Sequence, residues 1–134
     1  MLVGGYAVVA HGYVRATSDL DVWVRPTREN AARVLAAMQE FGLPPGLAME
    51  GLIETGSPPP TGFRFGRPPL AVDLLTSIQG VEFEDAWRTS EVRVLDGLEI
   101  RVIGRQALIA NKRSTGRTKD AADVEALEAI DLDG

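Results

Sequence analysis

The sequence contains no cysteine and only one histidine, His11. Without cysteine the chain can form no disulfide, no thiolate zinc site and no cysteine nucleophile. A single histidine also excludes a histidine-rich metal site. Any bound metal ion must therefore be held by carboxylates, which favours magnesium or manganese.

Long hydrophobic runs are also absent. The longest apolar run near the start, Tyr6 to Ala10, is far shorter than the core of a signal peptide or a membrane span, and no basic leader precedes it. We therefore expect a cytoplasmic protein without a membrane partner.

The size and composition are those of an ordinary globular protein. The 134 residues, of which 45% are hydrophobic and 25% charged, predict one domain over 1–134, with a core over about 1–103 and a helical pair over about 104–130. The net charge of −5 excludes attraction of nucleic acid by bulk electrostatics. A local anion site is nevertheless expected between Arg105 and Lys119, because that segment has no acidic residue and contains Arg105, Lys112, Arg113, Arg117 and Lys119.

Hydrophobic periodicity predicts alternating strands and helices, which indicates an α/β (α+β) layered domain. The expected strands are Leu2-Val3, Asp19 to Val24, Met49 to Glu54, Thr61 to Phe65, Leu70 to Leu75, Val92 to Leu95 and Leu98 to Ile103. The expected helices are Gly4 to Ala10, the segment capped by Thr27 and ended by Gly42, Phe83 to Arg88, Arg105 to Ser114 and Lys119 to Ile130. The first strand is short for a sheet, so we expect a further N-terminal element or a partner to complete that edge.

Three aspartates are candidate metal ligands. Asp19 and Asp21 are two positions apart on a predicted strand, so they share a face at a separation of about 7 Å. Asp73 stands in the apolar strand Leu70 to Leu75, where a carboxylate is costly unless it lies at an edge, is paired or binds a cation. An aspartate pair alone more often faces water or caps a turn, and Gly4-Gly5 alone more often forms a tight turn than a phosphate site.

Taken together, these motifs resemble a known family. Val3-Gly4-Gly5-Tyr6-Ala7, followed by the segment from Arg15 through Ser18, Asp19 and Asp21 to Val22, is similar to the glycine pair and D-x-D signature of minimal polymerase-beta-like nucleotidyltransferases. The resemblance implies that family's fold, a mixed sheet flanked by helices. It also implies that Gly4 and Gly5 cradle a nucleoside triphosphate, and that Asp19, Asp21 and Asp73 bind Mg²⁺ or Mn²⁺.

The C-terminal segment from Leu108 to Asp123 is similar to the K-x(n)-R-x-K-D-x-x-D segment of bacterial nucleotidyltransferase-like proteins, including toxin-type members of abortive-infection systems. This implies that Lys112 contacts phosphate, although a solvated or salt-bridged lysine is a nearly equal alternative. Asp120 and Asp123 are expected to cap the last helix or to fix Lys112 and Arg117.

Further candidates lie near the glycine pair. Arg15 and Ser18 are assigned to the nucleotide. Arg15 and Thr17 either steer phosphate or brace the turn before the strand. His11 either contacts the nucleotide or has a structural role at a helix end, and the structural role is the more common one.

The function that these residues favour is a magnesium-dependent transfer of a nucleoside monophosphate from a nucleoside triphosphate to a hydroxyl acceptor on a protein, an RNA or a small molecule. The partners expected are the triphosphate, the acceptor, and a helical partner protein or a second copy of the chain. One alternative is a non-catalytic nucleotide-binding module or a component of a toxin–antitoxin pair. Another is a carboxylate-metal nuclease or phosphohydrolase.

Overall fold

The computed structural model describes residues 1–17, 19–42, 52, 62–66 and 71–133. The chain divides into two compact units. We call the first, Met1–Thr17 with Ile78–Gly134, the terminal unit, and the second, Ser18–Ser77, the central unit. The prediction of a single domain remains a prediction.

Among the residues that the structure describes, the central unit has three strands and one α-helix. Strand β4 (Val72–Leu75) lies between β2 (Leu20–Trp23), with which it is parallel, and β3 (Gly62–Phe65), with which it is antiparallel. Helix α2 (Arg28–Phe41) begins after Thr27, whose side chain accepts a hydrogen bond from the Asn30 amide.

One face of these strands forms the hydrophobic core of the central unit. Val24 of the β2 segment and Leu74 of β4 cluster there with Ala31 and Met38 of α2 and with Leu52. Val22 and Phe63 pack against the same cluster. Because side chains alternate along a strand, the residues between these positions lie on the opposite face.

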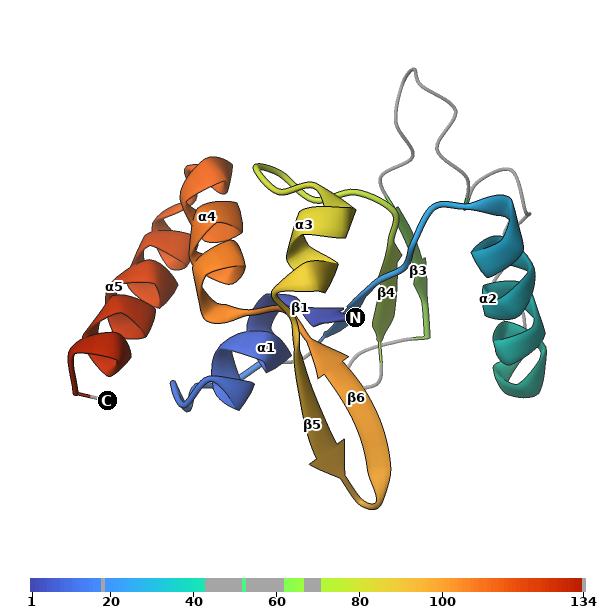
Figure 1. Cartoon of the computed structure of the whole chain (residues 1–134), viewed down its shortest axis with the longest axis horizontal. Coiled ribbons are helices and arrows are strands. Elements are labelled where there is room, and N and C mark those ends of the chain that lie inside the picture. Colours follow the sequence, from blue (N-terminus) through green and yellow to red (C-terminus); the bar gives the residue numbers. More distant parts are fainter. Residues whose placement is uncertain (18, 43–51, 53–61, 67–70, 134) are drawn as a thin grey trace. The chain divides into compact units, whose positions relative to one another are not determined.

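In the part of the terminal unit that the structure describes there are three strands and four helices, and Figure 1 shows how they are arranged. Strand β6 (Leu98–Val102) pairs in parallel with β1 (Leu2–Val3) and antiparallel with β5 (Glu91–Leu95). Helix α1 (Gly4–Ala10) directly follows β1, and helix α3 (Phe83–Arg88) precedes β5. Helices α4 (Arg105–Thr115) and α5 (Thr118–Asp133) follow β6 and pack side by side.

Two short turns shape the terminal unit. Gly116 ends α4 in the left-handed region, with φ of 68°, and so allows the chain to reverse into α5. Asp96 and Gly97, with φ of 51° and 80°, join β5 to β6. Two consecutive residues at positive φ are typical of the tight turn that matches the twist of a β-hairpin. The hairpin extends away from the helices of its unit (Figure 1).

The sequence predicted most of these elements. The expected strand at Leu2-Val3 and the expected helix at Phe83 to Arg88 are confirmed with the same bounds, and the other described elements agree within a few residues. The expected strand near Met49 to Glu54 lies almost entirely outside the described residues. The mixed α/β class, with parallel and antiparallel strand pairs, is confirmed. None of the described helices combines the length and apolar composition that a membrane span needs.

Candidate functional site

The three candidate aspartates lie in the central unit on the face opposite its core. Asp21 and Asp73 are register partners on the parallel strands β2 and β4, while their neighbours Val22 and Leu74 point into the core. Asp19 precedes Asp21 by two positions and therefore shares its side of the strand. The structure thus brings together the three carboxylates that the sequence singled out, although they come from distant segments.

Arg64 of β3 joins two of these aspartates. It is the register partner of Asp73, and its Nε and Nη2 atoms donate to the two carboxylate oxygens of Asp73 at 2.9 and 3.1 Å. The same Nη2 atom donates to Oδ2 of Asp19 at 2.7 Å. A single nitrogen is therefore shared by the carboxylates of Asp19 and Asp73. We call Asp19, Asp21, Asp73 and Arg64 the carboxylate cluster.

The cluster has more negative than positive charge and is open to solvent. The hydrogen bond with Asp73 and the negative charges of Asp73 and Asp19 raise the pKa of Arg64 above its ordinary value, so its guanidinium stays protonated. The side chains of Asp19 and Asp73 are 28% and 19% exposed. The guanidinium of Arg64 contacts the carboxylates of Asp19 and Asp73.

The donor chemistry of the cluster fits a magnesium or manganese ion, since carboxylate oxygens are the ligands these ions prefer. Within the described ranges, however, no three acidic or histidine side chains are already grouped as a metal site. Arg64 places its positive charge between Asp19 and Asp73, where the two could share a cation. Binding of a metal ion by both carboxylates therefore requires Arg64 to leave its present contacts.

The glycine pair lies in the terminal unit, at the start of α1. Gly4 has φ of 67°, a conformation that favours glycine. A Cβ atom on Gly5 would overlap Oγ1 of Thr17 and would lie 3.2 Å from Nη2 of Arg15. The close approach of Thr17 and Arg15 thus explains why position 5 carries no side chain. Ser18, the other residue assigned to the nucleotide, lies outside the described residues.

Lys112 lies at the centre of a buried ionic network in the terminal unit. Its side chain is 5% exposed, and its Nζ atom is 3.1 Å from Oδ1 of Asp120 and 3.1 Å from Oδ2 of Asp123. Arg15 binds Asp123 through two hydrogen bonds of 2.8 and 2.9 Å. This geometry corresponds to the salt-bridged alternative for Lys112, and the expected fixing of Lys112 by Asp120 and Asp123 is seen. Direct contact between Lys112 and phosphate remains a prediction.

Asp120 has the most partners in this network. Thr115 and Arg117 donate to its Oδ2 at 2.5 and 2.6 Å, and Lys112 contacts its Oδ1. Burial alone would raise the pKa of the Asp120 carboxyl, but the hydrogen bonds from Thr115, Lys112 and Arg117 outweigh burial and hold this pKa below its ordinary value. Asp120 therefore stays ionised at neutral pH and ties the end of α4 to the start of α5.

The basic segment from Arg105 to Lys119 is largely compensated by α5. Besides Lys112 and Arg117, Arg113 forms an ion pair with Glu128 of α5. Lys112, Arg113 and Arg117, on which the predicted anion site depends, therefore have carboxylate partners. Lys119 is exposed.

His11 takes a structural position at the end of α1. Its Nε2 atom donates to the carbonyl oxygen of Ile103 at 2.7 Å, and its side chain is 5% exposed. Its Nδ1 atom is 3.9 Å from Oε2 of Glu91, at the base of the hairpin. These contacts match the structural alternative for this histidine.

Arg64 is the residue that sequence reasoning missed. It belongs to the expected strand Thr61 to Phe65, between two aromatic residues, and a charged residue in such an alternating strand must face away from the core. That pattern predicts on which face of the strand Arg64 lies, but it does not predict which residue Arg64 contacts. Its relation to Asp73 depends on the pairing of β3 with β4, which only the register reveals.

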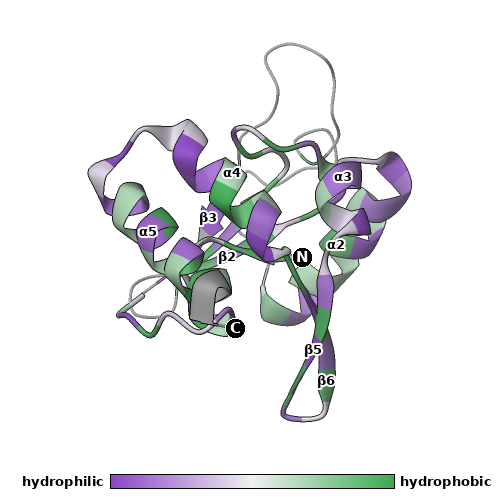
Figure 2. Ribbon diagram, turned by 60° about the vertical axis from the view of Figure 1, so that its left-hand side comes forward, coloured by the Kyte–Doolittle hydropathy of each residue, from purple (hydrophilic) through white to green (hydrophobic). Residues whose placement is uncertain are grey.

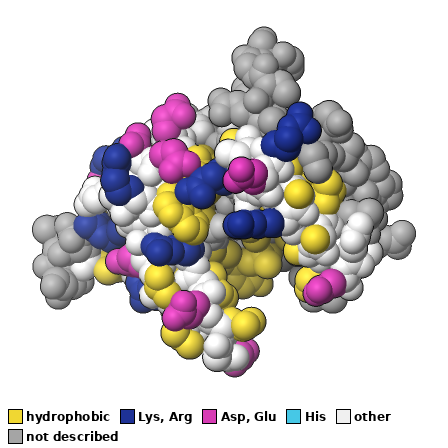
Figure 3. Space-filling model, turned by 45° about the vertical axis from the view of Figure 1, so that its right-hand side comes forward, with side chains coloured by type: hydrophobic (Ala, Val, Ile, Leu, Met, Phe, Trp, Pro, Cys, Tyr) yellow, Lys and Arg dark blue, Asp and Glu magenta, His cyan; other side chains and the backbone are white. Residues whose placement is uncertain are grey.

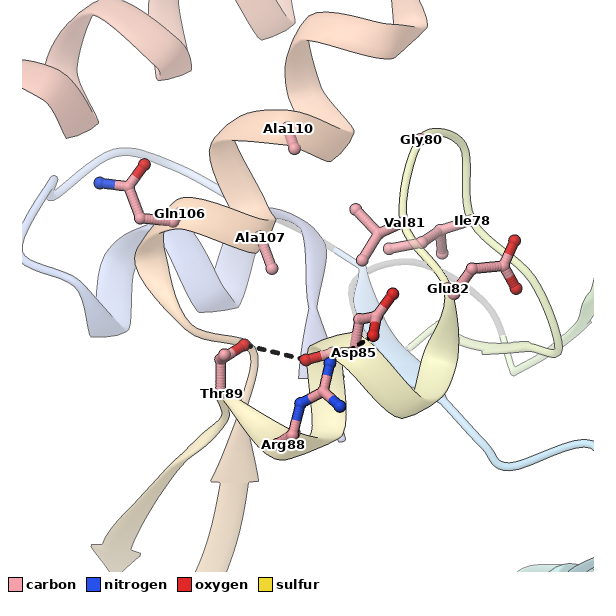
Figure 4. Close-up of a pocket in the computed structure, with 10 residues that line it drawn as sticks. All are labelled: Ile78, Gly80, Val81, Glu82, Asp85, Arg88, Thr89, Gln106, Ala107 and Ala110. Atoms are coloured by element: carbon pink, nitrogen blue, oxygen red, sulfur yellow. Dashed lines mark hydrogen bonds and ion pairs between the residues drawn. The ribbon is translucent and has the colours of Figure 1, made fainter.

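The terminal unit also contains a pocket of about 530 Å³ between α3, α4 and the turn near Gly80 (Figure 4). Its lining combines Ile78, Val81, Ala107 and Ala110 with polar residues such as Glu82 and Gln106. At one side, Arg88 donates to Asp85 at 2.5 Å, and Thr89 donates to the Asp85 carbonyl oxygen at 3.1 Å (Figure 4). Among the described residues, those predicted to bind metal or nucleotide do not line this pocket.

Comparison of the chain with protein-family models gives no match, and comparison with curated protein sequences gives none either. The assignment of function therefore depends on the residues themselves.

Proposed function

We propose that the chain is a metal-dependent nucleotidyltransferase that moves a nucleoside monophosphate from a nucleoside triphosphate to a hydroxyl acceptor. The carboxylate cluster is the observation that carries this proposal. Asp21 and Asp73 are neighbours across parallel strands, and Asp19 and Asp73 are close enough to share one nitrogen of Arg64. Convergent carboxylates are what nucleotidyl transfer most requires of a protein, because the reaction depends on positioning and charge neutralisation.

In this proposal the acceptor oxygen forms a bond with the α-phosphorus of the triphosphate. The bond from that phosphorus to the oxygen bridging the β-phosphate breaks, and pyrophosphate leaves. Asp19, Asp21 and Asp73 would hold the divalent ions, and Asp73 would also orient the acceptor hydroxyl and accept its proton. Bound there, the ions would neutralise charge on the triphosphate and on the leaving group.

The resemblance extends the proposal to the phosphate-binding residues. It assigns Gly4, Gly5, Arg15, Ser18 and Lys112 to the triphosphate. The contacts within the terminal unit support a linked role for two of them, since Asp123 binds both Arg15 and Lys112. Asp123 thereby holds the guanidinium of Arg15 beside Gly5, where a Cβ atom would lie 3.2 Å from Nη2.

The proposal is tested by incubating the protein with each of the four nucleoside triphosphates, labelled at the α-phosphate, in the presence of magnesium. Transfer of label to protein, RNA or an added small hydroxyl compound supports the proposal. Tight binding without transfer supports a binding module, and release of inorganic phosphate or cleavage of nucleic acid supports a hydrolase. The last two results would each refute transfer as the function.

Matched variants separate the carboxylate cluster from a contaminating activity. Asp19→Asn and Asp73→Asn each remove one charge from the cluster and should abolish transfer. Asp96→Asn makes the same chemical change in the hairpin turn, where φ of 51° also suits asparagine, and should leave transfer unchanged. Equal activity in all three variants would show that the cluster does not carry the reaction.

The position of Arg64 favours a second candidate function, a nucleotide-binding module without catalysis. In the structure a guanidinium already forms ion pairs with both Asp19 and Asp73. If the arginine stays there when a triphosphate binds, the chain binds nucleotide through its phosphates without activating it. If Asp19→Asn and Asp73→Asn both still bind the triphosphate without a metal ion, this result would favour the binding module.

A further inference from the structure

The β5–β6 hairpin exposes an unusual amount of hydrophobic surface. Residues 91–99 are all exposed. Four of them are large hydrophobic residues whose exposed fractions are 48% for Val92, 67% for Val94, 56% for Leu95 and 67% for Leu98. Hydrophobic side chains are visible on the projecting lower end of the molecule in Figure 3, and hydrophobic and hydrophilic residues alternate along the hairpin in Figure 2. Grouped apolar exposure of this kind is typical of an interaction surface.

Strand β5 is also an open edge. Within the described residues it pairs only with β6, and it is the last strand in the order β1-β6-β5. Its sequence, Glu91 to Leu95, has no proline, no lysine and no bulge that would block pairing with another strand. The edge is therefore able to accept a further strand.

The hairpin geometry determines which backbone groups face that edge. Leu95 and Leu98 flank the two-residue turn as register partners, and in such a hairpin the flanking residues bond to each other through both backbone groups. The direction of the backbone N–H and C=O groups alternates from one residue to the next, so those of Arg93 and Glu91 also point toward β6. Val92 and Val94 consequently point their N–H and C=O groups outward.

The charges of β5 are complementary to those of a second copy of the same strand. Glu91 and Arg93 lie on either side of Val92 in the sequence, and their side chains share the face of the strand opposite to that of Val92. They form an ion pair of 2.8 Å within the strand. We propose that β5 pairs antiparallel with β5 of a second copy, with Val92 on the twofold axis. In this register Val92 faces its own copy, and Glu91 of each protomer faces Arg93 of the other. This symmetric interface forms whether or not the chain is an enzyme.

Other registers are less favourable. With Arg93 on the axis, two arginines would face each other directly, and like charges directly opposite are destabilising. With Val94 on the axis, Val92 would face Asp96, whose positive φ takes it out of the strand. Only the register centred on Val92 uses the outward backbone groups and pairs opposite charges twice.

An interface made from one five-residue strand per protomer is smaller than a standard stable interface. The dimer should therefore be weak and form only at high protein concentration. It would join the β1, β6 and β5 strands of both protomers into one continuous sheet across the axis, with Val92 and Val94 of both protomers on a shared face. Part of the exposed hydrophobic surface of the hairpin would thereby be covered.

Charge reversal tests this register by sedimentation velocity at concentrations from micromolar to millimolar. The wild-type protein should show a reversible monomer–dimer equilibrium. Arg93→Glu alone, or Glu91→Arg alone, places like charges opposite each other twice and should weaken dimerisation about tenfold. The double variant with both changes restores opposite charges and should recover the dimer. A wild-type monomer throughout the range, or a dimer indifferent to the single changes, would overturn the proposal.

Cysteine cross-linking tests the same register independently, since the chain has no cysteine of its own. Two Val92→Cys protomers would bring their Cα atoms to about 5.5 Å, within disulfide range. In the same register two Val94 positions are about 13 Å apart along the strand, beyond that range. Under mild oxidation Val92→Cys should therefore form a covalent dimer rapidly and Val94→Cys should not. The reverse preference, or equal cross-linking of both variants, would contradict the register.

Discussion

The replacement Lys112→Met should strongly reduce the free energy of unfolding, because it removes a buried cation between two buried carboxylates. The side chains of Lys112, Asp120 and Asp123 are only 5%, 0% and 2% exposed. Removing one partner of a buried ion pair costs about 3–5 kcal/mol. Here Asp120 keeps Thr115 and Asp123 keeps Arg15, so the loss should be near the lower end, about 3 kcal/mol.

The size of this loss should also depend on pH. The pKa of Asp120 is lowered in the folded protein, so Asp120 contributes stability above its unfolded pKa of about 4, and that contribution disappears as the pH falls through the lower folded pKa. Methionine at position 112 removes one of the hydrogen bonds that lower the folded pKa. The wild-type protein should therefore lose more stability in acid than the variant, and the difference between them should narrow below about pH 4.

Urea denaturation followed by circular dichroism at neutral and acidic pH measures both quantities. Lys119→Met removes the same type of charge from an exposed position and should have little effect on stability. A loss of less than about 1 kcal/mol for Lys112→Met, the lower limit for leaving a buried polar group unsatisfied, would refute the reasoning. A difference that stays constant from neutral to acidic pH would also refute it.

Three further predictions concern other parts of the chain. Gly5→Ala should lower the free energy of unfolding by about 1–3 kcal/mol, because its Cβ atom would overlap Thr17. Thr17→Gly in the same protein should restore most of this loss in thermal denaturation. A Gly5→Ala variant as stable as the wild type would contradict the overlap. Leu127→Ala should cost about 2–5 kcal/mol in chemical denaturation because Leu127 is 0% exposed, whereas Leu98→Ala, at a position that is 67% exposed, should cost little; equal losses would be inconsistent with the described core. Arg64→Met should tighten manganese binding about tenfold, as judged by titration calorimetry, because it removes the cation that competes for Asp19 and Asp73; weaker binding would show that Arg64 supports the site.

Local patterns explain why the sequence predicted the elements well. Helix α2 has a capping threonine, apolar residues at helical spacing and a terminal glycine, all within one short segment. The β5–β6 hairpin has Asp96-Gly97 between two alternating runs. Each signal is complete within a few neighbouring residues, so no knowledge of distant contacts is needed.

The carboxylate cluster was only partly predictable, because it depends on pairing between distant strands. The two-residue period places Asp19 and Asp21 on one face, and the apolar strand around Asp73 predicts a partner or an edge position for that residue. The sequence does not specify that β2 lies beside β4 with Asp21 opposite Asp73. It likewise does not specify that β3 brings Arg64 to Asp73.

For Lys112 on helix α4, too, the sequence predicted the position of the side chain but not its partners. Its spacing from Leu108 predicts a side chain whose stem follows the buried face of a helix, which agrees with the structure. Whether its ammonium meets phosphate or a carboxylate depends on the packing of α5 against α4 after Gly116. That packing places Asp120 and Asp123 at Lys112, and it requires tertiary contacts that the helical period does not encode.

Manganese binding, followed by electron paramagnetic resonance in the presence of a non-hydrolysable nucleoside triphosphate, tests the carboxylate cluster directly. We expect the wild-type protein and Asp96→Asn to bind the ion, and Asp21→Asn and Asp73→Asn to lose this binding while remaining folded. Manganese binding of equal strength in all four proteins, or none in the wild type, would contradict the assignment of Asp19, Asp21 and Asp73 as a metal-dependent nucleotidyl-transfer site.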